Sequence, residues 1–197
     1  VYLTYDVNCG AVPCVDNPPA ADDFSDATSI CNLNGYCGNT SASYTDDEPG
    51  NITESSTLFP ATIENNSWLS FVASDVQSVL RINVSNCTHL PGEGNGIQMR
   101  IYGTDDGGTT FVAYSNFIES VTNHATIIAT GLTVGETYYL MIDGQNGDHC
   151  DYSISATSGV AASTVDAGND TTICQGQSVQ LNAVGGSTYQ WSPSTGL

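Results

Sequence analysis

Residues 125–144, ATIIATGLTVGETYYLMIDG, are the stretch that decides the fold class. Ile127 and Ala129 occupy alternate positions in its first half, and Leu140 and Ile142 do so in its second half. Successive side chains of a β-strand point to opposite faces, so this period of two predicts two strands, each with a buried face. The glycines between the two halves suit a turn. We therefore expect a hairpin at the centre of a sheet, with the other strands paired to it or packed on it.

The rest of the chain has the same kind of pattern. Its 197 residues can bury one core and part of a second. Leu80, Ile82 and Val84 alternate with polar residues and are expected to face the core. No long run has a helical period, and the polar stretch 46–57 is expected to be an exposed loop. The sequence therefore predicts an all-β, jelly-roll-like β-sandwich over residues 1–160, with further strands at 1–7, 61–74, 78–87, 96–103, 109–115 and 151–158.

The formal net charge is −19, and Arg81 and Arg100 are the only Lys or Arg residues. A nucleic-acid partner needs a basic face, so that class of function is excluded, and anionic membranes repel the chain for the same reason. No stretch approaches the roughly 20 apolar residues of a membrane-spanning helix, so we expect no membrane insertion. The charge is explained either by solubility in a salty medium or by carboxylates that bound Ca²⁺ neutralises.

Calcium is the cofactor that the sequence suggests, and no organic cofactor is expected. Asp143, Asn146 and Asp148 follow the second strand closely enough to bring oxygen ligands into one loop, where glycines allow the bend. Asp105 and Asp106, before two glycines, form a second candidate loop. Neither loop has the spacing of an EF-hand, so polar turns without a metal stay open as the alternative.

The cysteine content, seven in this chain, indicates an oxidising, extracellular compartment. Cys87 ends one predicted strand and Cys150 directly precedes another, so the two can meet at one edge of the sandwich and form a disulfide. The other pairings stay open, because six cysteines can pair in many ways. Among them we expect the local pairs Cys9–Cys14 and Cys31–Cys37.

Residues 161–197 differ in composition and are expected to start a second domain after a short linker, GVAAS (159–163). Cys174 near its first predicted strand and Trp191 on its third are typical of an immunoglobulin-like sandwich. Such a domain takes about 100 residues, so this one is expected to be truncated. Cys174 is then the cysteine without a partner in this chain.

The stretch SVQLNAVGGSTYQWSPSTGL (178–197) resembles the opening half of the PKD-like, immunoglobulin-fold repeats in large surface adhesins of gliding bacteria that use type IX secretion. The first domain is similar to modules of the same adhesins. The matching stretches are CNLNGYCGNTSASYT (31–45), IENNSWLSFVAS (63–74), INVSNC (82–87), GIQMRIYG (96–103) and GLTVGETYYLMIDGQNGDHCDYSI (131–154). The resemblance implies an extracellular protein with an adhesive or structural role, and it specifies no ligand.

Asn-x-Ser/Thr sequons supply candidate N-glycosylation sites. They are at Asn39, Asn51, Asn65, Asn83, Asn86 and Asn169. Thr171, in the sequence Asp170-Thr171-Thr172, resembles the O-glycosylation motif of the same group of bacteria. Asn51, in the polar stretch 46–57, and Thr171 are the strongest of these candidates.

No catalytic residue is expected. His89, His124 and His149 lie in or beside predicted loops, and the sequence has no nucleophile elbow. The leading interpretation is a non-catalytic surface adhesin or filament-forming subunit. Two alternatives stay open, namely an accessory domain of a secreted hydrolase and a carbohydrate-binding module that holds surface glycans. The latter would use an aromatic platform, unless these side chains fill the core: Tyr102, Phe111, Tyr114 and Phe117.

The partners that we expect are copies of the chain or adjacent domains of a longer chain. The chain begins with an alternating strand, VYLTYDV (1–7), so either a leader has been removed or the chain is part of a longer protein. The truncated second domain would expose a sheet edge, which is completed either by the same polypeptide or by a strand of a neighbouring subunit. The second arrangement predicts an open filament.

Overall fold

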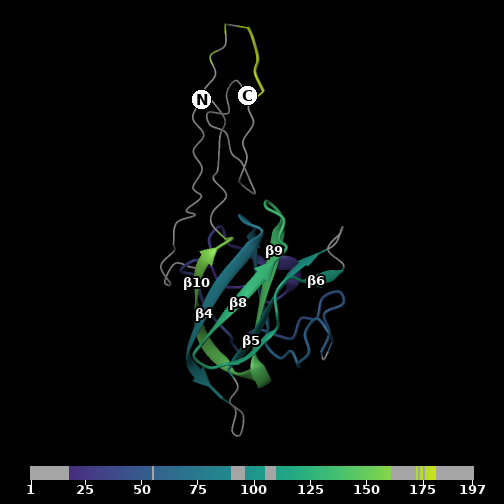
Figure 1. The fold of residues 1–197 in the computed structure, drawn as a ribbon, viewed down its shortest axis with the longest axis vertical. Helices are drawn as coiled ribbons and strands as arrows, with labels where there is room; N and C mark the ends of the chain where they lie inside the picture. Colours follow the sequence, from purple (N-terminus) through teal and green to yellow (C-terminus); the bar gives the residue numbers. More distant parts are fainter. Residues whose placement is uncertain are drawn as a thin grey trace.

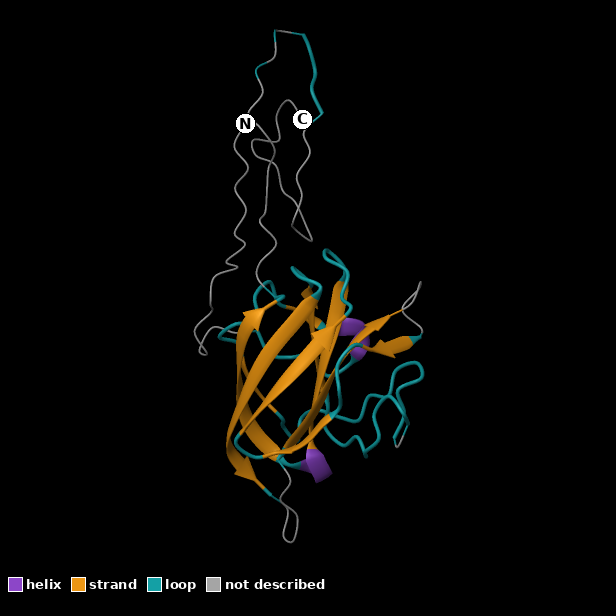
Figure 2. Cartoon of the chain, viewed as in Figure 1, coloured by secondary structure: helices purple, strands orange, loops and turns teal. Residues whose placement is uncertain are grey.

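The computed structural model describes residues 18–54, 56–89, 96–104, 110–160, 172, 174 and 176–180. Its regular structure is nearly all β, as the sequence predicts (Figure 2). The strands are β1 (Thr28–Ser29), β2 (Cys37–Asn39), β3 (Ser67–Val72), β4 (Gln77–Thr88), β5 (Ile97–Thr104), β6 (Phe111–Ala113), β7 (Ile118–Val121), β8 (His124–Thr130), β9 (Thr137–Gly144) and β10 (His149–Ser158). The helices are short 3₁₀ turns at Phe24–Asp26 and Gln145–Gly147, and no described helix has the length and apolarity needed to cross a membrane.

Two sheets pack face to face as a sandwich, which confirms the predicted fold class (Figure 1). The six-stranded sheet has the order β1-β3-β9-β5-β6, and β7 also pairs with β5. The four-stranded sheet has the order β2-β10-β4-β8. From β3 onward the chain crosses between the sheets at most steps, because β3, β5, β6, β7 and β9 belong to one sheet and β4, β8 and β10 to the other.

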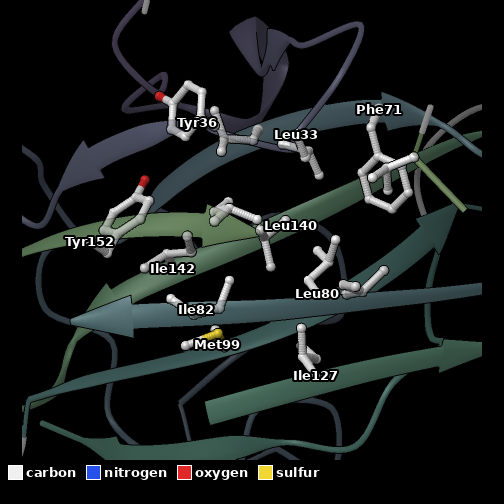
Figure 3. Close-up of a cluster of buried hydrophobic side chains, with 14 of the residues drawn as sticks. Leu33, Tyr36, Phe71, Leu80, Ile82, Met99, Ile127, Leu140, Ile142 and Tyr152 are labelled. Atoms are coloured by element: carbon white, nitrogen blue, oxygen red, sulfur yellow. The ribbon is translucent and has the colours of Figure 1, made fainter. Parts of the chain in front are cut away.

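The main core lies between the sheets (Figure 3). Leu80 and Ile82 of β4 are 0% exposed, and Val84 is nearly so, as the alternation in the sequence predicts. Leu140 and Ile142 of β9 meet them from the opposite sheet. Apolar side chains from both layers therefore hold the sandwich closed through the hydrophobic effect.

The hairpin predicted for residues 125–144 is wrong, although both of its strands exist. β8 lies at the edge of the four-stranded sheet, where it pairs with β4, whereas β9 lies between β3 and β5 in the six-stranded sheet. The turn between them therefore crosses from one sheet to the other. The physical reason is that β9 is buried on both of its faces and has both edges paired, with β3 and β5, whereas β8 buries only alternate side chains and suits an edge. Ile127 and Ala129 of β8 then meet Leu140 and Ile142 of β9 across the same core. Strands in opposite layers place these faces against each other.

A second apolar cluster covers the outer face of the six-stranded sheet. The long segment between β2 and β3, described at residues 40–54 and 56–66, forms this cover and is called the covering segment below. Its side chains Ile52, Phe59 and Ile63 pack on Trp68 and Met141 of the sheet. Ile52 and Phe59 are 0% exposed, so the prediction of a simple exposed loop at 46–57 is wrong for Ile52. The segment acts as a third layer because β9 has an apolar residue on both of its faces, and the outer one needs a cover.

Several expectations fall outside the described residues. They are the strand at 1–7, the pair Cys9–Cys14, the loop at Asp105 and Asp106, the modification sites Asn169 and Thr171, and most of the domain at 161–197 including Trp191.

Candidate functional site

The carboxylate of Asp143, predicted as a calcium ligand, is buried at the end of β9. Its Oδ1 accepts hydrogen bonds from the backbone N–H groups of Asn65 (2.9 Å) and Glu64 (3.2 Å), and its Oδ2 accepts one from Nε2 of Gln98 (2.7 Å). Burial raises the pKa of this carboxyl from 3.8 to about 7, although the three hydrogen bonds act in the opposite direction. Asp143 thereby ties the covering segment to β5 and β9.

Asp148 is equally buried and holds a different part of the chain. Its Oδ2 accepts a hydrogen bond from the backbone N–H of Gly96 at 2.8 Å and lies 2.6 Å from Nδ1 of His89. Asn146 lies between the two acids in a left-handed backbone conformation, with φ of 55°. Backbone N–H groups therefore donate to the carboxylates of Asp143 and Asp148, the two side chains that were predicted to bind Ca²⁺.

No group of three or more His, Cys, Asp or Glu side chains in the described residues could hold a metal ion. Calcium binding by Asp143, Asn146 and Asp148 stays a prediction. It is tested by comparing the melting temperature in added CaCl₂ with that in excess EDTA.

Asn65, one of the candidate N-glycosylation sites, is a structural residue in the folded protein. Its side chain is 4% exposed and bridges two parts of the loop after β9. Oδ1 accepts a hydrogen bond from the N–H of Gly144 at 3.0 Å, and Nδ2 donates to the carbonyl of Asp148 at 3.3 Å. A glycan on Nδ2 would require this buried network to open.

The other described sequons differ in how accessible they are. Asn51 is exposed, but its Oδ1 accepts a hydrogen bond from the backbone N–H of Phe111 at 2.8 Å. Asn83 is half-buried on β4, whereas Asn39 and Asn86 are exposed. Modification at these four positions stays a prediction. Asn39 is the site that the structure leaves most accessible, because Nδ2 of Asn86 donates a hydrogen bond to Oδ2 of Asp151.

The predicted disulfide between Cys87 and Cys150 is confirmed. It joins β4 to β10 beside a β-bulge in their pairing. The predicted pair Cys31–Cys37 is wrong, because Cys31 is a free, exposed thiol and Cys37 is disulfide-bonded elsewhere. Although the two are close in sequence, Cys31 follows β1 of the six-stranded sheet and Cys37 opens β2 of the four-stranded sheet.

The predicted aromatic platform is also wrong, and the alternative, that its residues fill the core, is correct. Tyr102 is 0% exposed and Phe111 is 2% exposed, both within the cluster under the covering segment. Phe117 packs edge-on against Phe59, with ring centroids 4.9 Å apart. Tyr114 packs in the same way against Tyr138. These rings therefore do not form an exposed surface for a sugar.

The candidate site is a polar hollow of about 290 Å³ on the four-stranded sheet, next to the disulfide. Its lining comes from the end of β2, the end of β4 and the start of β10: Asn39, Thr40, Ser41, Asn86, Thr88, His149, Cys150 and Asp151. Asp151 pairs with Asn39 on one side and with Ser85 on the other, so the exposed residues Asn39 and Asp151 are neighbours on the outer face.

The backbone is irregular on two strands of this hollow. The pairing of β4 with β10 shifts between His149 and Asp151, and Asn86 has a left-handed φ of 52°, which is uncommon for a residue other than glycine. The result is a hydrogen bond from Nδ2 of Asn86 to Oδ2 of Asp151 at 2.8 Å. The sequence singled out Asn39 and Asn86 as sequons and Cys150 as half of a disulfide, but it contains no signal that these residues meet Asp151.

No known protein family, curated protein or solved structure matches the chain. The function is therefore argued from the residues and their geometry.

Proposed function

We propose that this chain is a non-catalytic, extracellular module of a surface adhesin or of a filament. The observation that carries the proposal is the structural use of its buried polar side chains. Asp143, Asp148, Asn65 and Gln98 accept or donate hydrogen bonds that hold loops onto the sandwich. Buried groups that are hydrogen-bonded in this way stabilise a rigid scaffold, whereas a catalytic acid or base needs access to a substrate.

Two further features support an extracellular location. The disulfide between Cys87 and the buried Cys150 joins β4 to β10, the two central strands of the four-stranded sheet. Such a bond is expected in an oxidising compartment. The net charge of −19 keeps such a module soluble and discourages non-specific contact with anionic surfaces. The resemblance to repeat adhesins agrees with both features.

The proposal is tested with the full chain immobilised on beads, which are passed under flow over polysaccharide-coated and bare surfaces. We expect retention on the coated surface above that of beads carrying an unrelated protein of equal charge, or else growth of filaments by the free chain in electron micrographs. A chain that shows neither behaviour, or that turns over ester or glycoside substrates, would contradict the proposal.

A further inference from the structure

The polar hollow beside the disulfide has features of a built site. Three strands, β2, β10 and β4, converge there, and the bulge at His149 together with the left-handed Asn86 turns side chains toward one another. Unusual backbone conformations that the surroundings maintain are concentrated at functional sites. The disulfide at Cys150 lines the same hollow, so its floor is covalently fixed.

The charge of the hollow limits what it can bind. Asp151 is the only carboxylate among the lining residues, and neither arginine of the chain is among them. Phosphate, sulfate and acidic sugars therefore find no Lys or Arg in the lining and meet a chain of net charge −19. Calcium takes about six to eight oxygen ligands, usually with several carboxylates, so a single carboxylate is a poor calcium site.

The hydrogen-bonding groups indicate a neutral, hydroxyl-rich ligand. Asn39 carries an amide with both donors and acceptors, Asp151 accepts, and Thr88 and His149 add further polar groups. Each hydroxyl of a sugar both donates and accepts, so neighbouring hydroxyls are recognised by such a mixture of amide and carboxylate groups. A volume of about 290 Å³ is at the lower end for ligand pockets and suits one sugar ring.

We propose that this hollow binds one ring of a neutral saccharide, with Asn39, Asn86 and Asp151 as the recognising side chains. The hydrogen bond between Asn86 and Asp151 holds the carboxylate in place before the ligand arrives, which lowers the entropic cost of binding. Because the hollow is small and no Phe, Tyr or Trp ring lines it, the dissociation constant of a single sugar is on the order of millimolar. The inference rests on the proposed function, since it names the class of partner that an adhesive module holds.

The experiment is a titration of the full, ¹⁵N-labelled chain with glucose, galactose, mannose and N-acetylglucosamine, followed by NMR. We expect at least one of these sugars to shift the amide signals of residues 39–41, 86–88 and 149–151 in a saturable way. The variant Asn39→Ala removes an exposed amide without a buried contact and is expected to weaken binding at least fivefold. Asn123→Ala, which alters an exposed asparagine outside the hollow, is the matched control and is expected to bind as the unmodified chain does.

Three outcomes would overturn the inference. The first is the absence of a saturable shift with every sugar, and the second is a shift that Asn39→Ala leaves unchanged. The third is a response of the same amides to CaCl₂ alone with none to sugars, which would identify a cation site. If no sugar binds but the beads still adhere, or the chain still forms filaments, only this inference is refuted. Sugar binding without adhesion or filaments refutes only the proposed adhesive role.

Discussion

At the scale of single residues, Asp143 shows how burial can override local hydrogen bonding. Three N–H donors face its carboxylate and favour the charged form, yet removal from water raises its pKa to about 7. The folded protein therefore holds a proton at pH values at which the unfolded chain has lost it. This difference makes folding sensitive to pH.

We predict that Asp143 makes the protein less stable as the pH rises from about 4 to about 7. Its contribution to stability is complete below the unfolded pKa of 3.8, decreases through the window between the two pKa values, and is lost above about 7. The full change is on the order of 4 kcal/mol.

Urea unfolding of the natural chain and of Asp143→Asn across this pH range measures the effect. The asparagine is neutral at every pH, so the difference in unfolding free energy between the two proteins should depend on pH with this sign. Two parallel curves would show that Asp143 does not have the raised pKa.

At the scale of elements, the segment before β3 is part of the core although it has almost no regular structure. Ile52, Phe59 and Ile63 of this segment pack on the six-stranded sheet, and Phe24, from the 3₁₀ turn before β1, extends the same apolar layer by packing edge-on against Trp68, Phe111 and Tyr139. Hydrogen bonds to Asp143 from residues 64 and 65 hold the end of the segment. The sheet therefore has an apolar layer on both faces.

We predict that Phe59→Ala lowers the free energy of unfolding by about 3–5 kcal/mol, because it opens a cavity under the cover. Phe59 is 0% exposed, whereas Val76 is 61% exposed, so Val76→Ala serves as the control and should change stability little. Urea unfolding measures both changes. In a Trp191→Phe background the fluorescence of Trp68 should also shift to longer wavelength. A Phe59→Ala protein as stable as the control would mean that the covering segment is not a packed layer.

At the scale of the whole molecule, the Cys87–Cys150 disulfide joins neighbouring strands that are 63 residues apart in sequence. Residues 88–149 include most of the six-stranded sheet, so the link limits the unfolded chain over a large part of the sandwich. A cross-link over such a long loop removes much of the conformational entropy of the unfolded state.

We predict that Cys87→Ser with Cys150→Ser lowers the free energy of unfolding by about 4 kcal/mol. Cys31→Ser is the matched control, since Cys31 is a free, exposed thiol. Chemical denaturation under oxidising conditions compares the three proteins. An equal loss in the control, or no loss in the double variant, would contradict this role of the disulfide.

The sequence by itself determined the all-β class, the strands β3, β4, β5, β8, β9 and β10 and the inward faces of residues such as Leu80 and Ile82. These features follow from the period of two and from apolar side chains, both of which are local properties. It also indicated the Cys87–Cys150 disulfide, because both cysteines lie at strand ends.

Only the tertiary structure decided which sheet each strand joins, and with it the candidate site. An alternating pattern identifies the buried face of a strand but not the strand with which it pairs. The sequence therefore predicted that β8 and β9 form a hairpin, although they lie in opposite sheets. For the same reason the sequence did not show that Asp143 meets Gln98, 45 residues away, or that Asn39 and Asn86 flank Asp151. These contacts depend on pairing between strands that are far apart in the sequence. That pairing is selected because it lets the two sheets and the covering segment bury their apolar side chains against one another, which is favourable through the hydrophobic effect.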